Sequence, residues 1–193
     1  VLTVSRDAEG KLTGIPGEIS ESVVWMEIER QSNEGANALI AAIKETIEDV
    51  RVSVEDWQAM RDKMLQVADT VGNLNLQASE IEPSEAKLFL QWAADNHFTF
   101  LGFREYRLSQ VNNESQLDAV PHTGLGLLRD DHHPAHARPA KTLGRRQGNR
   151  HELLILTKTA ARSTVHRSTY MDYIGVLIYD ANGVTVGEYR FIG

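Results

Sequence analysis

Apolar residues recur at intervals of three and four from residue 39 to residue 71, and this pattern constrains the fold more than any other feature of the sequence. Because an α-helix has 3.6 residues per turn, such spacing places the apolar side chains on one face. We therefore expect a helix from about residue 35 to residue 70. Ser53, followed by Asp56, could instead cap a second helix, so a break at that point is an open alternative. The residues of the stripe are Leu39, Ile43, Ile47, Val50, Val54, Trp57, Met60, Met64, Val67 and Val71.

The residues before this helix are predicted to form strands. Residues 1–6 and 11–15 flank a turn sequence that ends at Gly10, which can supply the positive φ of a tight turn. Residues 22–30 are rich in valine, tryptophan and isoleucine, so we expect a strand there as well.

A polar stretch at residues 72–82 predicts a linker, and we place a domain boundary between residues 75 and 80. Pro83 favours the first turn of a new helix, because the N–H that proline lacks would be unpaired there in any case. Asn96 can end that helix in the left-handed conformation. The two expected modules are therefore residues 1–75 and residues 80–193.

The second module is predicted to be rich in strands. We expect strands at residues 98–108, 124–129 and 152–159, and the apolar run Leu153–Leu156 is typical of a central strand. Residues 130–150 are polar and contain prolines, histidines and arginines, so they are expected to form a mobile excursion.

The C-terminal residues predict a hairpin. Residues 173–179 and 184–192 flank Asp180-Ala181-Asn182-Gly183, which is typical of a tight turn. The apolar positions change parity at Gly187, and this predicts a β-bulge. The complete pattern indicates an α+β fold with antiparallel β-sheets covered by helices.

Composition excludes several classes of protein. The chain has a net charge of −7, with 18 acidic and 8 basic residues in its first hundred. Such a chain is a poor partner for nucleic acid. It has no cysteine, which excludes disulfides and thiolate sites and fits a cytoplasmic location. No apolar run approaches the roughly 18 residues of a membrane span, and polar residues interrupt any signal peptide, so no membrane partner is expected.

Two motifs resemble cofactor or metal sites without completing them. Gly124-Leu125-Gly126 begins like a dinucleotide loop, but the third glycine and the following helix are missing, so no cofactor site is expected. Asp130-Asp131-His132-His133 with His136 offers metal-ligand residue types, but a rigid frame that makes them converge is not indicated. We therefore expect a solvated loop and no metal.

Residues 162–172 contain the strongest candidate for a binding site. Ser163, His166 and Asp172 are too close in sequence for a catalytic triad, which usually joins distant parts of a chain. Arg162, His166 and Arg167 are instead expected to contact an anion, because guanidinium groups pair well with carboxylates and phosphates. The partner could be a carboxylate effector or an acidic face of another domain.

Large aromatic residues lie on the apolar faces of the predicted elements, and we expect them to pack in a core rather than to stack on bases. They are Trp25, Trp57, Trp92, Phe98, Phe100 and Phe103.

Several motifs, in one order, resemble the large bacterial NAD-specific glutamate dehydrogenase family in its N-terminal region. The similarity starts at about Ser22, and small departures occur at His97, Phe103 and Ser168. The matching segments are Trp25–Arg30, Asp49–Arg51, Val54–Trp57, His97–Tyr106, Gly124–Gly126, Leu156–Lys158, Arg162–Arg167, Asp172–Val176 and Gly187–Gly193.

The resemblance implies a regulatory or assembly role. In that family the whole protein deaminates L-glutamate to 2-oxoglutarate with NAD, and its catalytic domain lies far C-terminal to the region that matches. No catalytic residue of the family falls on this sequence. Residues 1–75 would be an ACT-like portion with the long helix, and residues 80–193 a second module that is ACT-like or PAS-like. The implied partners are other domains or subunits of the dehydrogenase and an amino-acid effector.

Three rival interpretations remain. The chain could be a stand-alone enzyme that uses the His/Asp loop or residues 162–172, a stand-alone small-molecule sensor, or a purely structural spacer.

Overall fold

The computed structural model describes residues 1–74, 79, 81–111, 114–137 and 152–193. The described chain divides into two units, residues 1–40 and residues 41–193, and each is described by itself. None of the helices in these ranges combines the length and the apolar composition that crossing a bilayer requires.

The first unit contains the predicted N-terminal hairpin. Strands β1 (Leu2–Arg6) and β2 (Leu12–Glu21) are antiparallel, and Gly10 has the positive φ, 82°, that the turn requires. The Arg6 Nε atom donates to Glu21 Oε1 at 2.5 Å and joins the two strands at their exposed edge.

The prediction of a strand at residues 22–30 is wrong. Residues 22–32 form no regular structure, and the Trp25 side chain is 81% exposed. The prediction came from β-propensity, which describes how a side chain fits a paired and half-buried surface. These residues have no neighbouring strand in the described chain, so the side-chain packing that β-propensity reflects is missing.

The apolar stripe forms one continuous helix, α1 (Asn33–Gly72), without the break that Ser53 and Asp56 could have introduced. Ser53 Oγ donates to the carbonyl of Asp49, one turn earlier, so it does not cap a new helix. Asp56 is buried, and its carboxylate accepts hydrogen bonds from Gly126 N at 2.8 Å and Arg129 at 2.7 Å. The side chains of α1 that are buried all lie at or after Ser53.

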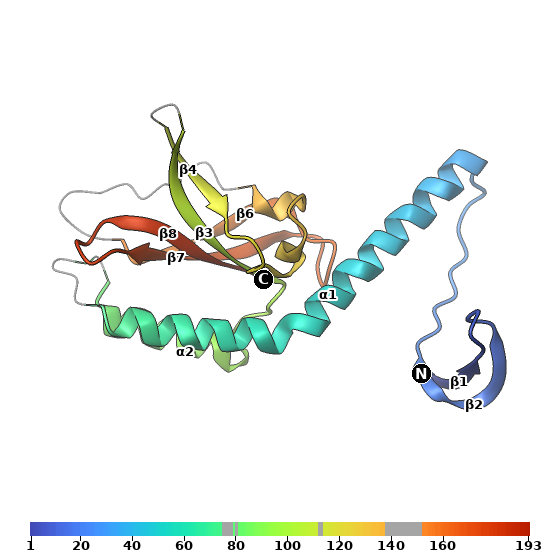
Figure 1. The fold of residues 1–193 in the computed structure, drawn as a ribbon. Coiled ribbons are helices and arrows are strands. Elements are labelled where there is room, and N and C mark those ends of the chain that lie inside the picture. Colours follow the sequence, from blue (N-terminus) through green and yellow to red (C-terminus); the bar gives the residue numbers. More distant parts are fainter. Residues whose placement is uncertain (75–78, 80, 112–113, 138–151) are drawn as a thin grey trace. The chain divides into compact units, whose positions relative to one another are not determined.

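The second unit is an antiparallel sheet with strand order β4-β3-β8-β7-β6, and β5 adds to β3 (Figure 1). Helix α2 (Pro83–Trp92) is followed by a π-helical turn (Ala93–His97), and short 3-10 turns cover Leu127–Arg129 and Pro134–His136. The strands are β3 (Gly102–Val111), β4 (Glu114–Ala119), β5 (Leu125–Gly126), β6 (Leu154–Arg162), β7 (Tyr170–Tyr179) and β8 (Thr185–Ile192).

The fold is α+β, as the sequence patterns predicted. Helices α1 and α2 lie on one face of the sheet (Figure 1), and buried side chains from both helices pack there against the strands. Phe103, Ile174 and Phe191 supply this face from three adjacent strands. The boundary predicted between residues 75 and 80, and the ACT-like or PAS-like character of the modules, stay predictions.

The opposite face of the sheet is covered by the segment that follows β4. Leu127, Leu128 and Ala135 are buried there against Tyr173 and Ile192. The expectation of a mobile excursion is therefore wrong for residues 130–137, which pack on the sheet because Ala135 fills a place in this core. The rest of that segment, residues 138–151, lies outside the described residues.

Several strand predictions need correction. The strand expected at residues 98–108 begins at Gly102, β4 was not predicted, and only two residues of the strand predicted at 124–129 belong to a strand, β5. Strand β6 lies at the edge of the sheet rather than at its centre. Within its apolar run, Leu154 packs on the helix side and Ile155 on the other, so both faces are buried at the start of this edge strand, whereas Leu156 is 54% exposed.

The C-terminal hairpin is confirmed. Gly183 has φ 74° in the turn between β7 and β8. The pairing shifts by one residue between Ile178–Gly187 and Tyr179–Thr185, which places the predicted bulge beside Gly187.

The contacts of Asp56 lead to a testable prediction. Replacement by alanine leaves the Gly126 N–H and the Arg129 guanidinium without their acceptor, and hydrogen bonds to charged groups contribute about 1.5–3 kcal/mol. Asp56→Ala should therefore lower the free energy of unfolding by that amount in a urea titration. Asp62→Ala, on the same helix but 65% exposed, is the matched control and should change it by less than about 0.5 kcal/mol. Equal effects of the two substitutions would contradict this account of Asp56.

Candidate functional site

The loop between β6 and β7 is held in a tight, defined conformation by its own hydrogen bonds. Ser163 N donates to Thr169 O at 2.8 Å and closes the loop. Ser163 Oγ donates to the Val165 carbonyl at 2.6 Å, and Arg167 N donates to the same carbonyl at 2.8 Å. These bonds enclose His166, whose φ of 66° lies in the left-handed region that side chains other than glycine rarely occupy.

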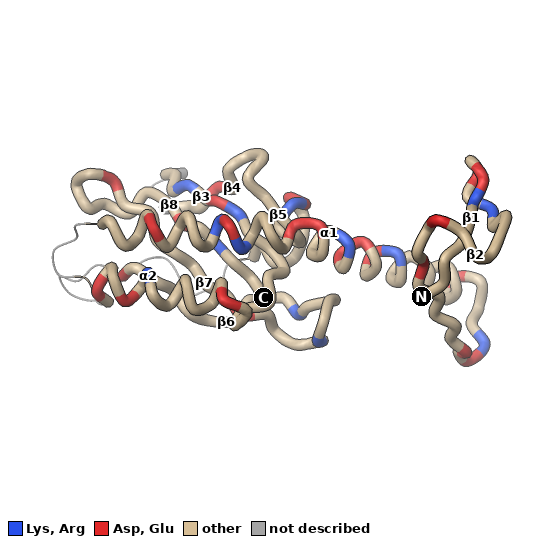
Figure 2. The backbone as a smooth tube through the Cα atoms, turned by 90° about the horizontal axis from the view of Figure 1, so that it is seen from below, with Lys and Arg blue, Asp and Glu red and all other residues tan. Residues whose placement is uncertain are grey.

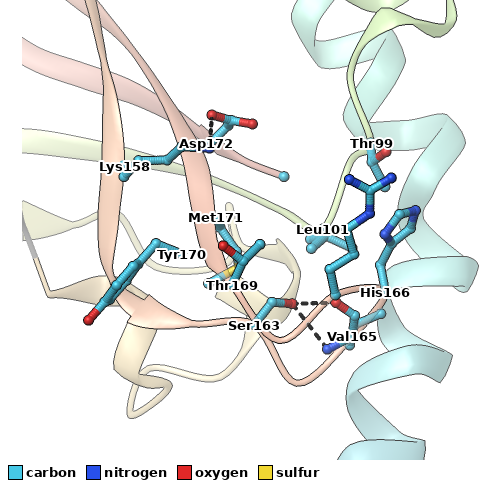
Figure 3. Close-up of a pocket in the computed structure, with 12 residues that line it drawn as sticks. Thr99, Leu101, Lys158, Ser163, Val165, His166, Thr169, Tyr170, Met171 and Asp172 are labelled. Carbon is cyan, nitrogen blue, oxygen red and sulfur yellow. Dashed lines mark hydrogen bonds and ion pairs between the residues drawn. The ribbon is translucent and has the colours of Figure 1, made fainter.

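A cavity of about 340 Å³ lies beside this loop (Figure 3). Lys158 and Asp172 face each other across the β6–β7 ladder and form an ion pair of 2.6 Å at its wall. The cavity is lined by Thr99, Leu101, Lys158, Ser163, Val165, His166, Arg167, Thr169, Tyr170, Met171, Asp172 and Gly193.

The structure brings together two of the three predicted cations. His166 and Arg167 line the cavity, whereas Arg162 does not. The Arg162 guanidinium lies over the Tyr170 ring at 5.3 Å and donates to the Ser168 carbonyl at 3.5 Å. Among the described residues none of the three forms an ion pair with a carboxylate, so the acidic partner expected for them stays a prediction.

A second cavity, of about 460 Å³, adjoins the first and is mainly apolar. The two cavities share Thr99, Leu101, Val165 and His166. The remaining wall of the second cavity comes from α1 and from the segment that precedes β3, and consists of Val50, Ser53, Val54, Trp57, Arg61, Ala94, Asn96, Phe98 and Phe100.

The expectation that the tryptophans pack in the core is wrong. Trp57 is 44% exposed at its wall, and Trp25 and Trp92 are also exposed, so none of the three packs in the core. Phe100 and Phe103 are buried as predicted. The sequence signal for this cavity would have been the apolar spacing of α1 at Val50, Val54 and Trp57, which the prediction assigned to the core.

The motifs that resembled catalytic, cofactor or metal sites form none of these arrangements within the described residues. Ser163 bonds to Val165 and not to His166, so no triad forms. The N–H groups of Gly126 and Leu127 donate to Asp56 and to the Leu101 carbonyl, so they do not point to a ligand. No three metal-ligating side chains converge in the described part of the chain.

Comparison with known proteins places the chain in one family. No family model matches it. The NAD-specific glutamate dehydrogenases of Halomonas elongata and Pseudomonas aeruginosa are each 32% identical to it, over 206 and 209 aligned residues. The alignments cover the whole chain but only 13% and 12% of these relatives, at their N-terminal part. The chain corresponds to an N-terminal region of the NAD-specific glutamate dehydrogenase family.

A buried polar network, which the sequence patterns did not predict, lies on the face of the sheet that the segment after β4 covers. Arg190 and Glu188 are 1% and 0% exposed, and Arg190 Nε lies 3.2 Å from Glu188 Oε1. Tyr173 donates its hydroxyl to Glu188. The Arg190 guanidinium also lies 3.9 Å from the centre of the Tyr106 ring and donates to the His136 carbonyl at 2.8 Å.

His136 closes this network on the side of the 3-10 turn. Its Nδ1 atom lies 2.7 Å from the Tyr106 hydroxyl, and its Nε2 atom lies 2.7 Å from the Asp130 carbonyl. Burial raises the pKa of Tyr106 to about 12. Burial lowers the pKa of His136, and the nearby Arg104 and Arg190 charges add to that effect, while the bond to the Asp130 carbonyl opposes it. The alternation of charged and apolar residues along β8 was the available signal.

The lowered pKa of His136 predicts a pH dependence of stability. The unfolded chain takes up a proton at the ordinary histidine pKa of about 6.5, whereas the folded chain resists it. The contribution of His136 is therefore complete above about pH 6.5, falls as the pH decreases, and levels off below the folded pKa.

This dependence is measured by urea unfolding at pH 7.5 and pH 5.0 for the wild-type chain and His136→Gln. The wild type should lose more stability between the two values than the variant, because glutamine does not titrate. His132→Gln, an exposed neighbour, is the control and should follow the wild type. A wild-type loss equal to that of His136→Gln would show that this histidine does not couple to folding.

Proposed function

We propose that this chain is a regulatory region of an NAD-specific glutamate dehydrogenase and that it contributes no catalytic residue. The whole protein would convert L-glutamate to 2-oxoglutarate with NAD, and the residues for that reaction would lie outside this region. The observation that carries the proposal is the match over the full chain to only 13% and 12% of two such dehydrogenases.

The geometry of the candidate site supports binding better than catalysis. Ser163, the serine that lines this cavity together with His166, uses its hydroxyl within its own loop, as donor and acceptor to Val165. The Asp172 carboxylate is engaged by Lys158. An exposed guanidinium such as that of Arg167, beside an apolar cavity, can hold an anionic molecule, but it supplies no nucleophile–base pair for a chemical step.

Effector sensing is therefore the regulatory role that we favour. An amino-acid effector would occupy the cavity beside His166 and Arg167, and other domains or subunits of the dehydrogenase would receive the effect. Binding to the native state stabilises it, so an effector must raise the melting temperature, whereas a purely structural spacer would show no such change.

Docking for assembly is a second candidate, and exposed apolar side chains on α1 favour it. Ile47 and Val54 are 61% and 64% exposed, although they continue the stripe that is buried further along the helix. Arg162 is also exposed, and it could pair with an acidic face of a neighbouring domain.

The non-catalytic assignment can be tested directly. The purified chain, incubated with L-glutamate and NAD, should produce no NADH above background at 340 nm. A full-length glutamate dehydrogenase at the same molar concentration serves as the positive control. NADH formation by the chain that depends on glutamate and increases with protein concentration would overturn the proposal.

A further inference from the structure

We infer that the two adjoining cavities form one binding site for a small molecule that joins a carboxylate to an apolar group of about the size of an aromatic or branched side chain. The inference rests on the proposed regulatory function and names the class of its ligand. The carboxylate and the apolar group of this ligand would each occupy one cavity, and the two cavities meet at His166.

The apolar half of the ligand would lie against α1. The cavity there has a volume of about 460 Å³, and Val54, Trp57 and Phe98 contribute apolar surface to it. This volume is within the range of about 300–1,000 Å³ that small-molecule sites commonly have. Transfer of an apolar group from water to these side chains is favourable by about 25 cal/mol for each Å² buried.

The charged half follows from the ion pairs of the other cavity. Lys158 is neutralised by Asp172 at 2.6 Å, so this pair adds no net charge. Arg167 lines the same cavity and has no carboxylate partner among the described residues. A guanidinium binds a carboxylate with two parallel hydrogen bonds, which makes a carboxylate the preferred ligand group at this position.

The backbone of the loop places His166 where the two cavities meet. Its left-handed φ of 66° is an uncommon conformation for a histidine, and hydrogen bonds within the loop hold it. Figure 3 shows the His166 ring on the side of the loop that faces α1, and Thr99 lines the same two cavities. From this position the ring contributes to the walls of both cavities, so a ligand that spans them must pass it.

The site lies between two elements that are already linked. Thr164 Oγ1 donates to Asp49 Oδ2 on α1 at 2.6 Å, and Ser53 Oγ lies 3.4 Å from the Leu101 carbonyl. A ligand that contacts Trp57 on α1 and Arg167 on the loop adds a further connection between them. Acidic residues recur along α1 (Figure 2), so the cationic loop is the part of the site that attracts an anion.

The inference is tested on the purified chain with 3-phenylpropanoate as the probe, by isothermal titration calorimetry. Two analogues separate the halves of the ligand: 3-phenylpropanamide keeps the shape without the charge, and propanoate keeps the charge without the ring. The amide should bind at least about tenfold more weakly than 3-phenylpropanoate, since one charge-assisted hydrogen bond accounts for about a factor of ten. Propanoate should also bind at least about tenfold more weakly, because it lacks the ring that the apolar cavity would remove from water.

Variants locate the binding. Arg167→Ala should weaken 3-phenylpropanoate about tenfold or more, whereas Arg162→Ala, which removes the same charge outside both cavities, should change it by less than about twofold. Binding should also change the tryptophan fluorescence, and Trp57→Phe should abolish that change although Trp25 and Trp92 remain. The circular dichroism spectrum of each variant shows whether it is folded.

Each outcome has a defined meaning. Equal affinity for the acid and the amide, or equal effects of the two arginine substitutions, would overturn the carboxylate assignment. Failure of every probe to bind the folded wild-type chain would overturn the whole inference and leave a protein face as the partner of the loop. Neither result bears on the NADH assay, which tests the proposed function by itself.

Discussion

The whole second unit depends on one constraint, the burial of strand β8 on both faces of the sheet. Phe191 points toward the helices and is fully buried there, whereas Arg190 and Glu188 are buried on the opposite face. A charged pair inside a protein is tolerated only where hydrogen bonds and opposite charge compensate for lost hydration. The segment after β4 provides that compensation, because the His136 carbonyl accepts a hydrogen bond from Arg190.

This requirement explains why a polar segment folds back onto the sheet. A glycine at position 175 gives the charged pair its space, since a Cβ there would lie 2.9 Å from the Tyr173 ring and 3.2 Å from the Glu188 carboxylate carbon. The 3-10 turn then covers the pair and inserts Ala135 into the same core. Composition alone indicated a solvated excursion, because residues 130–137 are polar. Their contacts are made to strands far away in the sequence.

The parts of the fold that sequence predicted correctly are those that depend on local spacing. The long helix, the turn at Gly183 and the bulge beside Gly187 follow from patterns within a few residues. The errors concern pairing over long distances: residues 22–30, predicted as a strand, have no neighbouring strand among the described residues, and β6 lies at an edge. The candidate site divides in the same way. His166 and Arg167 were found because they are adjacent, whereas Trp57 reaches the same site from another element.

Helix α1 belongs to both the core and the candidate site. One part of its apolar stripe is buried against the sheet, and another part lines the apolar cavity. Met60 and Met64 are completely buried on the sheet, Trp57 is half-exposed at the cavity, and Ile47 is exposed. The spacing of the stripe is the same throughout, so exposure changes along it only because the sheet ends. Apolar surface in water is unfavourable in proportion to its area. A ligand or a protein that covers this end of the stripe therefore gains free energy from the same side-chain pattern that folds the domain.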